Sequence, residues 1–303
     1  MISKSQFSTA AKRWFQAGQN VIAEAAPLLG QGITAQNAIE VAYDLQAGSY
    51  VRIVSAPERE SEQIAWGKRV AGVLTALGIN SACEAGTGEA TTLAHVARAA
   101  PPALHLSGFD ISLSRVLYGR DYLRAKGATA ELFCAEMLRI PLADSAVDAI
   151  ITNHSLEPNG GQEAPLLGEL LRVAARYLVL VEPDYEKGSA EQKARMARHN
   201  YVRDLARHLG KFPGRILRYE EWPFAPNPQN KASLIVFEKA DAKAAPDSLQ
   251  LVSPIGKFPL TPADGCLFCA REGLLYPKPF GIPVLREEAA VLCFHAEHFC
   301  GTT

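Results

Sequence analysis

The stretch Glu84-Ala85-Gly86-Thr87-Gly88-Glu89-Ala90 combines carboxylates with two closely spaced glycines. Glycine lets the backbone turn sharply and approach a ligand closely, and the first N–H groups of a following helix have no partner within that helix. The next apolar run ends in Asp110, where a carboxylate can accept two hydrogen bonds from a ribose diol. The spacing therefore predicts a turn that binds a nucleotide-like ligand.

Further polar side chains follow two later apolar runs, at the points where these runs end. His154 is the preferred general base, since an imidazole ordinarily has a pKa near neutrality, and Asp184 is a second candidate. Packing or substrate orientation is the alternative role for His154, and a hydrogen-bonded strand-end carboxylate is the alternative for Asp184. The predicted contacts to an acceptor are Glu157, Tyr185, His199 and Tyr201.

Cysteines and histidines gather near the C-terminus. Cys266 and Cys269 have a CxxC spacing, and the final residues "CFHAEHFC" hold Cys293, His295, His298 and Cys300. Thiolates and imidazoles are the ligands of tetrahedral zinc sites, so a metal site is one interpretation. A loosely ordered chain end is the other.

The composition is that of an ordinary folded chain. It has 303 residues, 48% hydrophobic residues and a net charge of −1, which argues against a dedicated nucleic-acid binder. No apolar run reaches the ~18 residues that a membrane span requires. The N-terminus lacks the apolar core of a signal peptide, so we expect a cytoplasmic chain with free cysteines.

The elements that must position these residues follow a regular order. Residues 1–62 read as a helical cap, ending in a connector or flap over 47–63, and residues 63–240 alternate buried strands with helices. This alternation predicts an α/β fold with a doubly wound parallel sheet, closed by an antiparallel hairpin over 214–222 and 232–240. A linker at 241–248, a small β-rich module at 249–292 and a tail at 293–303 complete the predicted organisation.

Over residues 63–240 the chain resembles the class I S-adenosylmethionine-dependent methyltransferases, whose Rossmann-like sheet ends in such a hairpin. A dinucleotide site would want a glycine where Thr91 stands. The resemblance implies S-adenosylmethionine as cofactor, with Glu136 meeting the adenine amino group and Met137 packing on the ring. The cofactor-binding residues that it implies are Glu84, Gly86, Thr87, Gly88, Asp110, Ile111, Glu136, Met137 and Asn153.

Residues 249–292 are similar to the small zinc-ribbon-type activator subunit of tRNA, rRNA and release-factor methyltransferases, most specifically in "YPKPFGIPVL". The four thiolate positions of that family fall here on Ser253, Gly256, Cys269 and Glu272. One thiolate remains of the four that the family's zinc site uses, so no metal is expected. The resemblance implies that this module packs on the catalytic domain of its own chain.

The leading interpretation is a methyltransferase with a small-molecule acceptor, such as a sugar or nucleotide-sugar hydroxyl. The alternatives are a tRNA or protein methyltransferase with its activator fused in the same chain, and a non-catalytic cofactor-binding partner of another methyltransferase. Neither a membrane nor, for lack of a basic and aromatic stripe, a nucleic acid is expected as a partner. A homodimer is considered as an assembly.

Overall fold

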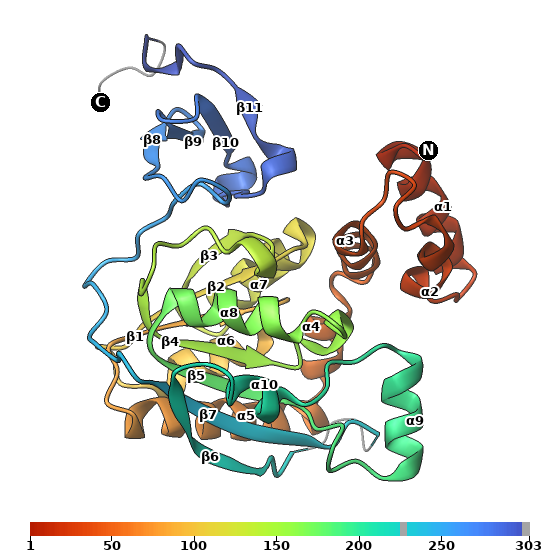
Figure 1. Ribbon diagram of the computed structural model, residues 1–303, viewed down its shortest axis with the longest axis vertical. Helices are drawn as coiled ribbons and strands as arrows, with labels where there is room; N and C mark the ends of the chain where they lie inside the picture. Colours follow the sequence, from red (N-terminus) through yellow and green to blue (C-terminus); the bar gives the residue numbers. More distant parts are fainter. Residues whose placement is uncertain (225–228, 299–303) are drawn as a thin grey trace.

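A seven-stranded sheet forms the centre of the molecule (Figure 1). The computed structural model describes residues 1–224 and 229–298. The sheet has the order β3-β2-β1-β4-β5-β7-β6, in which β1 to β5 are parallel and β7 is antiparallel to both of its neighbours. The predicted fold class and its closing hairpin are confirmed. The strands are β1 (Ser81–Ala85), β2 (His105–Asp110), β3 (Glu131–Cys134), β4 (Val147–Asn153), β5 (Ala174–Pro183), β6 (Gly214–Glu221) and β7 (Ala232–Lys239).

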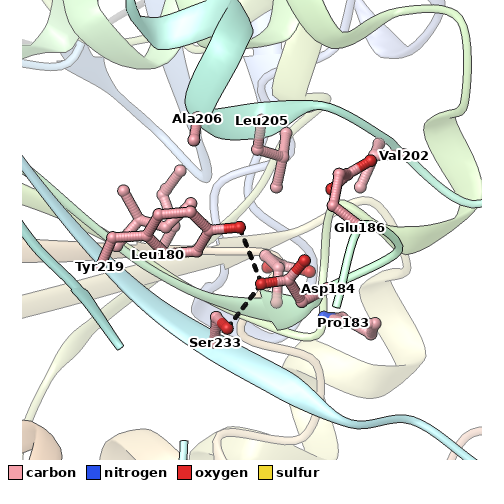
Figure 2. A pocket seen from close by; sticks show the side chains of 11 residues that line it. Leu180, Pro183, Asp184, Glu186, Val202, Leu205, Ala206, Tyr219 and Ser233 are labelled. Carbon is pink, nitrogen blue, oxygen red and sulfur yellow. Dashed lines mark hydrogen bonds between the residues drawn. The ribbon is translucent and has the colours of Figure 1, made fainter. Parts of the chain in front are cut away.

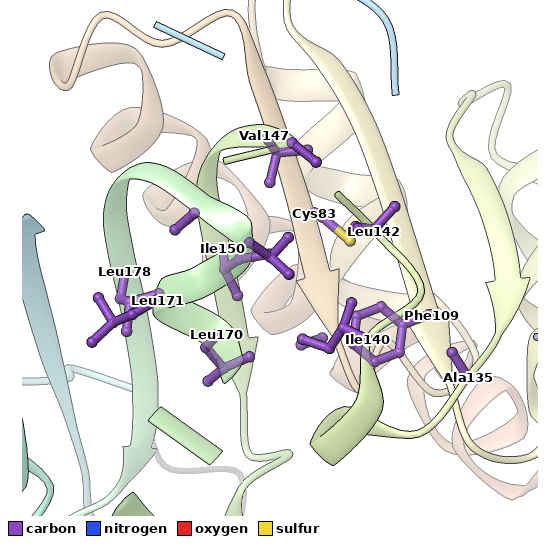
Figure 3. Close-up of a cluster of buried hydrophobic side chains, with 14 of the residues drawn as sticks. Cys83, Phe109, Ala135, Ile140, Leu142, Val147, Ile150, Leu170, Leu171 and Leu178 are labelled. Atoms are coloured by element: carbon purple, nitrogen blue, oxygen red, sulfur yellow. The ribbon is translucent and has the colours of Figure 1, made fainter. Parts of the chain in front are cut away.

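Both faces of this sheet are buried, because successive side chains of a strand point to opposite faces. Ile150 and Leu178 belong to one apolar cluster (Figure 3), and their chain neighbours Ile151 and Val179 belong to another. Each buried Leu or Ile stabilises the fold by roughly 1.5–3 kcal/mol. The helices packed along the sheet are α5 (Pro57–Ala76), α6 (Thr91–Ala99), α7 (Leu113–Ala125), α8 (Glu163–Val173) and α10 (Leu205–Leu209), with the short helical turns η2 (Met137–Arg139) and η3 (Glu157–Asn159).

The N-terminal helices form a cap with its own small core around Phe7, Val21 and Ala38. They are α1 (Lys4–Gln16), α2 (Val21–Ala25), η1 (Ala26–Leu28), α3 (Ala35–Leu45) and α4 (Ser49–Val54). The connector predicted for 47–63 is wrong in its conformation, because this segment contains α4 and the start of α5. Pro57 at the first position begins α5, and the predicted boundary at 62/63 falls inside that helix.

The insert between β5 and β6 contains α9 (Ala190–Arg198) and a loop that is fastened to the loop after β4. The N–H of Gly160 donates to the carbonyl of Asn200, and the Asn200 amide donates back to the carbonyl of Gly160. A side chain at Gly160 would lie 2.4 Å from that Asn200 oxygen. The insert is therefore closely docked against the carboxyl end of β4.

The C-terminal module is a four-stranded antiparallel sheet that forms backbone hydrogen bonds with the central domain. The N–H of Cys134 in β3 donates to the carbonyl of Pro283, and the N–H of Leu285 donates to the carbonyl of Cys134. Leu285 and Tyr276 also share the main apolar cluster of the central sheet. These contacts pair the end of β3 at Cys134, whose backbone groups would otherwise be unpaired at the sheet edge. The elements of the module and tail are β8 (Thr261–Ala263), β9 (Cys266–Cys269), β10 (Leu274–Pro277), η4 (Pro279–Gly281), η5 (Glu287–Ala289), β11 (Val291–Leu292) and η6 (Ala296–His298).

Among the described helices, none has the length and apolar character that a membrane crossing requires.

Candidate functional site

A cavity of about 1010 Å³ lies between the cap and the carboxyl ends of β1, β2 and β4. In parallel α/β sheets this edge is where ligands bind. Every residue predicted to bind the cofactor lines it, as do four residues predicted for catalysis or acceptor binding. The predicted residues that meet there are Glu84, Gly86, Thr87, Gly88, Asp110, Ile111, Glu136, Met137, Asn153, His154, Glu157, His199 and Tyr201.

The turn after β1 adopts a conformation that only glycine tolerates well. Gly86 and Gly88 have φ values of +72° and +56°. A Cβ atom on Gly86 would lie 2.4 Å from the Cβ of Ser155, so the turn and the loop after β4 approach each other closely. A side chain at Gly86 would thus clash with the loop after β4, and the backbone of both glycines lines the cavity.

Glu84 at the end of β1 is buried and hydrogen-bonded. Its carboxyl group accepts hydrogen bonds from the Thr87 hydroxyl at 2.7 Å and from the Asn153 amide at 2.6 Å. Burial raises the pKa of Glu84 to about 7. The Asn153 oxygen accepts a hydrogen bond from the Trp66 indole at 3.1 Å, so the Asn153 side chain links Glu84 to the helix α5.

Asp110 at the end of β2 faces the same turn. It accepts hydrogen bonds at 3.0 Å from the N–H of Gly88 and at 3.0 Å from the N–H of Ser112. A carboxylate has about four acceptor positions, so both oxygens keep capacity for a ligand's hydroxyl groups. These two backbone bonds fix the orientation in which Asp110 offers that capacity.

Glu136 and Met137 follow β3 and form the neighbouring wall. Burial raises the pKa of Glu136, and nearby Arg139 offsets part of this effect. The Met137 methyl group would lie 3.3 Å from a Cβ on Gly86, which places its flexible side chain beside the glycine turn. The predicted apolar surface therefore lies next to the predicted polar contact.

His154 and Glu157 form a hydrogen-bonded pair at the end of β4, with 2.6 Å between the imidazole Nδ1 and the carboxylate Oε1. His154 has a φ of +52°, an uncommon backbone conformation for this residue type. Its other nitrogen, Nε2, is buried and has no hydrogen-bond partner among the described residues. Burial alone would lower the pKa of His154, but the bond to Glu157, with the charges of Glu157 and Glu182, raises it overall.

Two predicted residues do not reach the cavity, and their assignments are corrected. The Asp184 carboxylate accepts hydrogen bonds from the Tyr219 hydroxyl at 2.9 Å and from the Ser233 hydroxyl at 2.6 Å (Figure 2). It lines a small internal space of about 10 Å³ and fastens the closing hairpin to the end of β5. Tyr185 lies beneath the Arg203 guanidinium, 4.5 Å from its ring centroid. Both residues directly follow β5, near the site, but the Asp184 side chain contacts the hairpin and the Tyr185 side chain contacts the insert.

The far side of the cavity is formed by α9 and the loop that follows it. Arg195 and Arg198 line it together with His199 and Tyr201, and neither arginine forms an ion pair with a carboxylate within the described part of the chain. Burial and the charge of Glu157 raise the pKa of Tyr201 to about 12, and burial and the two arginines lower that of His199. This side of the cavity therefore carries positive charge from two arginines, and the Glu157 carboxylate acts on the same histidine and tyrosine.

The sequence reading missed a second set of residues around the glycine turn. The Glu89 carboxylate accepts from the N–H of Gly48 at 3.0 Å and of Val51 at 2.7 Å, which caps the start of α4. The Arg115 guanidinium lies over the rings of Tyr43 and Tyr50, with 5.1 and 4.6 Å to their centroids. No local pattern marks Arg115 or Trp66, because helix periodicity does not show which neighbouring element a residue meets.

The four positions that align with thiolates come together in the C-terminal module. Cys269 contacts both Ser253 and Glu272, and a Cβ on Gly256 would lie 2.3 Å from a Glu272 carboxylate oxygen. A carboxylate therefore fills the space at this corner of the module. No group of three or more His, Cys, Asp or Glu side chains with metal-binding geometry occurs among residues 1–224 and 229–298. Cys300 lies outside the described residues.

Comparison with known proteins addresses the central domain. Residues 82–176 match the family model of a methyltransferase domain. Similar solved structures include magnesium protoporphyrin IX methyltransferase from Synechocystis PCC 6803 (16% identity, 60% of this chain and 84% of that chain covered, TM-score 0.48). Another is a SAM-dependent methyltransferase from Aquifex aeolicus (21% identity, 55% of this chain and 87% of that chain covered, TM-score 0.43). A third is a geranyl diphosphate methyltransferase (13% identity, 53% of this chain and 72% of that chain covered, TM-score 0.42). No curated protein sequence matches the chain significantly.

Proposed function

We propose that this chain, whose residues 82–176 match a methyltransferase domain, is a class I S-adenosylmethionine-dependent methyltransferase that methylates a hydroxyl group of a small-molecule acceptor. Sugars and nucleotide sugars are the acceptors that we propose first. The observation that carries this proposal is one continuous cavity, which runs from the glycine turn and Asp110 past His154 to α9 and the cap helices. At about 1010 Å³ the cavity lies at the upper end of the roughly 300–1,000 Å³ of ligand pockets, which supports a site for a cofactor together with a small acceptor.

The residues on the β1, β2 and β3 side fit S-adenosylmethionine. We assign the ribose hydroxyls to Asp110, whose carboxylate is held by the N–H of Gly88. The adenine lies in this proposal beside Glu136 and Met137, which offer an acceptor and an apolar surface. The rest of the cofactor lies, in this proposal, beside Gly86 and the end of β1, which both line the cavity. The bound cofactor supplies an activated methyl group, and the protein aligns the acceptor with it.

His154 is the proposed general base of this reaction. When its Nδ1–H donates to Glu157, the lone pair is on Nε2, the nitrogen with no hydrogen-bond partner among the described residues. Nε2 would then accept the proton of the acceptor hydroxyl. The cofactor would supply the methyl group, whose carbon–sulfur bond breaks and leaves a neutral thioether as the bond to the hydroxyl oxygen forms. Glu157 holds the ring orientation and stabilises the imidazolium that results, so it acts as a positioning residue.

The charge of the far wall supports an acceptor that carries an anionic group. Arg195 stacks over Tyr201 with 5.7 Å to the ring centroid, and its guanidinium also donates to the Asn230 side chain. Arginine binds phosphate oxygens in a bidentate manner, and Arg198 lies on the same helix one turn later. A nucleotide sugar combines such phosphates with hydroxyl groups, which is why we place it first.

Two further proposals concern the rest of the chain. The C-terminal module is proposed to be an activator-like domain that stabilises the catalytic domain in the same chain, and its contacts to β3 support this role. The described cysteines are unpaired, which supports the proposed cytoplasmic location. The alternatives, a tRNA or protein substrate and a non-catalytic partner role, remain outcomes of the test.

The test measures cofactor binding and transfer separately. Titration calorimetry with S-adenosylmethionine is expected to show binding of one cofactor per chain, and absence of heat together with an unchanged melting temperature would remove the enzyme assignment. Transfer of a labelled methyl group is then measured with nucleotide sugars, neutral sugars, tRNA and protein extracts. Activity only on tRNA or protein would replace the proposed acceptor, and binding without transfer to any of these acceptors would favour the partner role.

A further inference from the structure

The cap helix α3 forms part of the cofactor cavity and is fastened by two carboxylates. Ile39 and Tyr43 line the cavity, while Glu40 and Asp44, one turn apart, make ionic and hydrogen-bonded contacts outside it. The Asp44 carboxylate accepts a hydrogen bond at 2.7 Å from the hydroxyl of Ser112, two residues after Asp110. This contact ties one point of α3 to the catalytic domain.

The second fastening point comes from the opposite end of the chain. Glu40 forms an ion pair with Arg286 of the C-terminal module, with 2.5 Å between Oε1 and Nη1. The Arg286 side chain is only 5% exposed, and the Glu40 side chain is 19% exposed. Arg286 follows Leu285, whose N–H donates to the carbonyl of Cys134 in β3, so the backbone beside this arginine is fixed to the central sheet. The module thereby contacts the cap directly.

Breaking this pair would leave Glu40 without a charged partner among the described residues, and would leave the buried Arg286 guanidinium with Glu288, at 3.4 Å, as its remaining ion-pair partner. Loss of one partner of a buried ion pair is strongly destabilising, because the other charge keeps its desolvation cost. The Glu40 oxygen Oε2 and the Arg286 nitrogen Nε already lack partners among the described residues. The local consequence falls on α3, an 11-residue helix, and a helix of that length depends on tertiary contacts for its stability.

We propose that Arg286 is a positioning residue for cofactor binding: through Glu40 it holds α3 in place as a wall of the cavity. The C-terminal module then contributes to cofactor affinity without touching the cofactor. If α3 is loosened, part of the free energy of binding is used to order it, and the apparent affinity falls. This inference rests on the cofactor part of the proposed function and is independent of the acceptor.

The chain offers a matched control. Arg139 and Glu287 form a second ion pair between the catalytic domain and the module, also at 2.5 Å, but both side chains are about half exposed (49% and 58%). Exposed pairs contribute little to stability. Glu287→Gln therefore removes an interdomain pair of the same chemistry with no contact to α3.

The experiment compares Glu40→Gln, Arg286→Gln and Glu287→Gln in the full chain. We expect both variants of the buried pair to weaken S-adenosylmethionine binding in calorimetry by about tenfold, a typical coupling between sites. Hydrogen exchange of α3 is expected to accelerate in both without cofactor. Glu287→Gln is expected to match the unmodified chain in both measurements. The exchanged pair Glu40→Arg with Arg286→Glu is expected to recover part of the affinity.

Three results would overturn the positioning role. The first is unchanged exchange of α3 in Glu40→Gln, and the second is equal losses of affinity in Glu40→Gln and the control Glu287→Gln. A lower melting temperature with unchanged cofactor affinity would reduce the pair to a structural contact and also reject the proposal. Failure of the unmodified chain to bind the cofactor would contradict the proposed function. The hydrogen-exchange measurement on α3 needs no cofactor, so it tests the link between Arg286, Glu40 and α3 separately.

Discussion

Glu84 and Asp110 show how two carboxylates at neighbouring strand ends acquire different surroundings. The Glu84 carboxyl group is bonded to the Thr87 and Asn153 side chains, and its pKa rises to about 7 by burial. Asp110 accepts two backbone N–H groups and borders the cavity. The first therefore organises the turn and the loop after β4, while the second keeps hydrogen-bonding capacity at the cavity, which is why we propose it for the ribose.

The Asp110 assignment predicts a loss of cofactor affinity. A hydrogen bond to a charged group contributes about 1.5–3 kcal/mol, so Asp110→Asn is expected to weaken S-adenosylmethionine binding roughly 10- to 100-fold in calorimetry. Asp121→Asn is the control, because Asp121 is an exposed carboxylate on α7 that pairs with Arg120 and Arg124. Equal affinity in Asp110→Asn and the control, with both variants folded, would reject the site.

The His154–Glu157 pair predicts a change in pH dependence. A general base acts when it is deprotonated, so the rate should rise as the pH rises through the pKa of His154, which lies above its ordinary value near 6.5. Glu157→Gln removes the charge that raises this pKa, so the rising limb should move to lower pH, with a lower maximal rate. NMR titration of the His154 ring checks the shift without an acceptor. An unmoved titration midpoint would contradict the assigned role of Glu157.

The two glycines of α5, Gly67 and Gly72, differ in whether a neighbouring helix packs against them. Gly67 of α5 lies against α6, and a Cβ there would be 2.4 Å from the Cβ of His95, whereas Gly72 in the same helix has open space around it. The close contact brings α5 onto α6 beside the glycine turn. One glycine of this helix therefore serves packing and the other does not.

This difference predicts opposite effects of the same substitution. Gly67→Ala is expected to lower the free energy of unfolding by about 1–3 kcal/mol, because the packed helices must move apart. Gly72→Ala is expected to raise it by about 0.5–1 kcal/mol, because alanine favours the helix. Urea denaturation measures both. Equal changes in the two variants would show that α5 and α6 do not pack as described.

The N-terminal cap and the C-terminal module contact each other as well as the central domain. The module contacts β3 through its backbone and α3 through Arg286, while the main apolar cluster runs from the sheet to Tyr276 and Leu285. The cap and the module thus meet on one side of the cavity. The cap lines the cavity directly, whereas the module reaches it through Glu40 of α3.

The altered zinc-ligand positions predict a module held by its apolar core. Ser253, Gly256 and Glu272 supply no thiolate, and Glu272 fills the corner near Gly256. We expect substoichiometric zinc in the purified chain and no change in melting temperature on addition of a chelator, because a structural zinc would contribute directly to folding. One tightly held zinc per chain in metal analysis would contradict this.

The sequence by itself determined the order of strands and helices, because buried strands and amphipathic helices have periodicities of 2 and about 3.6 residues that can be read locally. The glycine turn and Asp110 could be read from the pattern, since strand ends and glycine turns lie at one edge of a parallel sheet, while the full set of nine candidate cofactor residues came from the resemblance to class I methyltransferases. Only the tertiary structure decided that Asp184 faces the hairpin, that Arg115 and Trp66 border the cavity, and that Glu40 meets Arg286. These facts depend on which elements pack together across long stretches of chain, and local periodicity carries no record of that pairing.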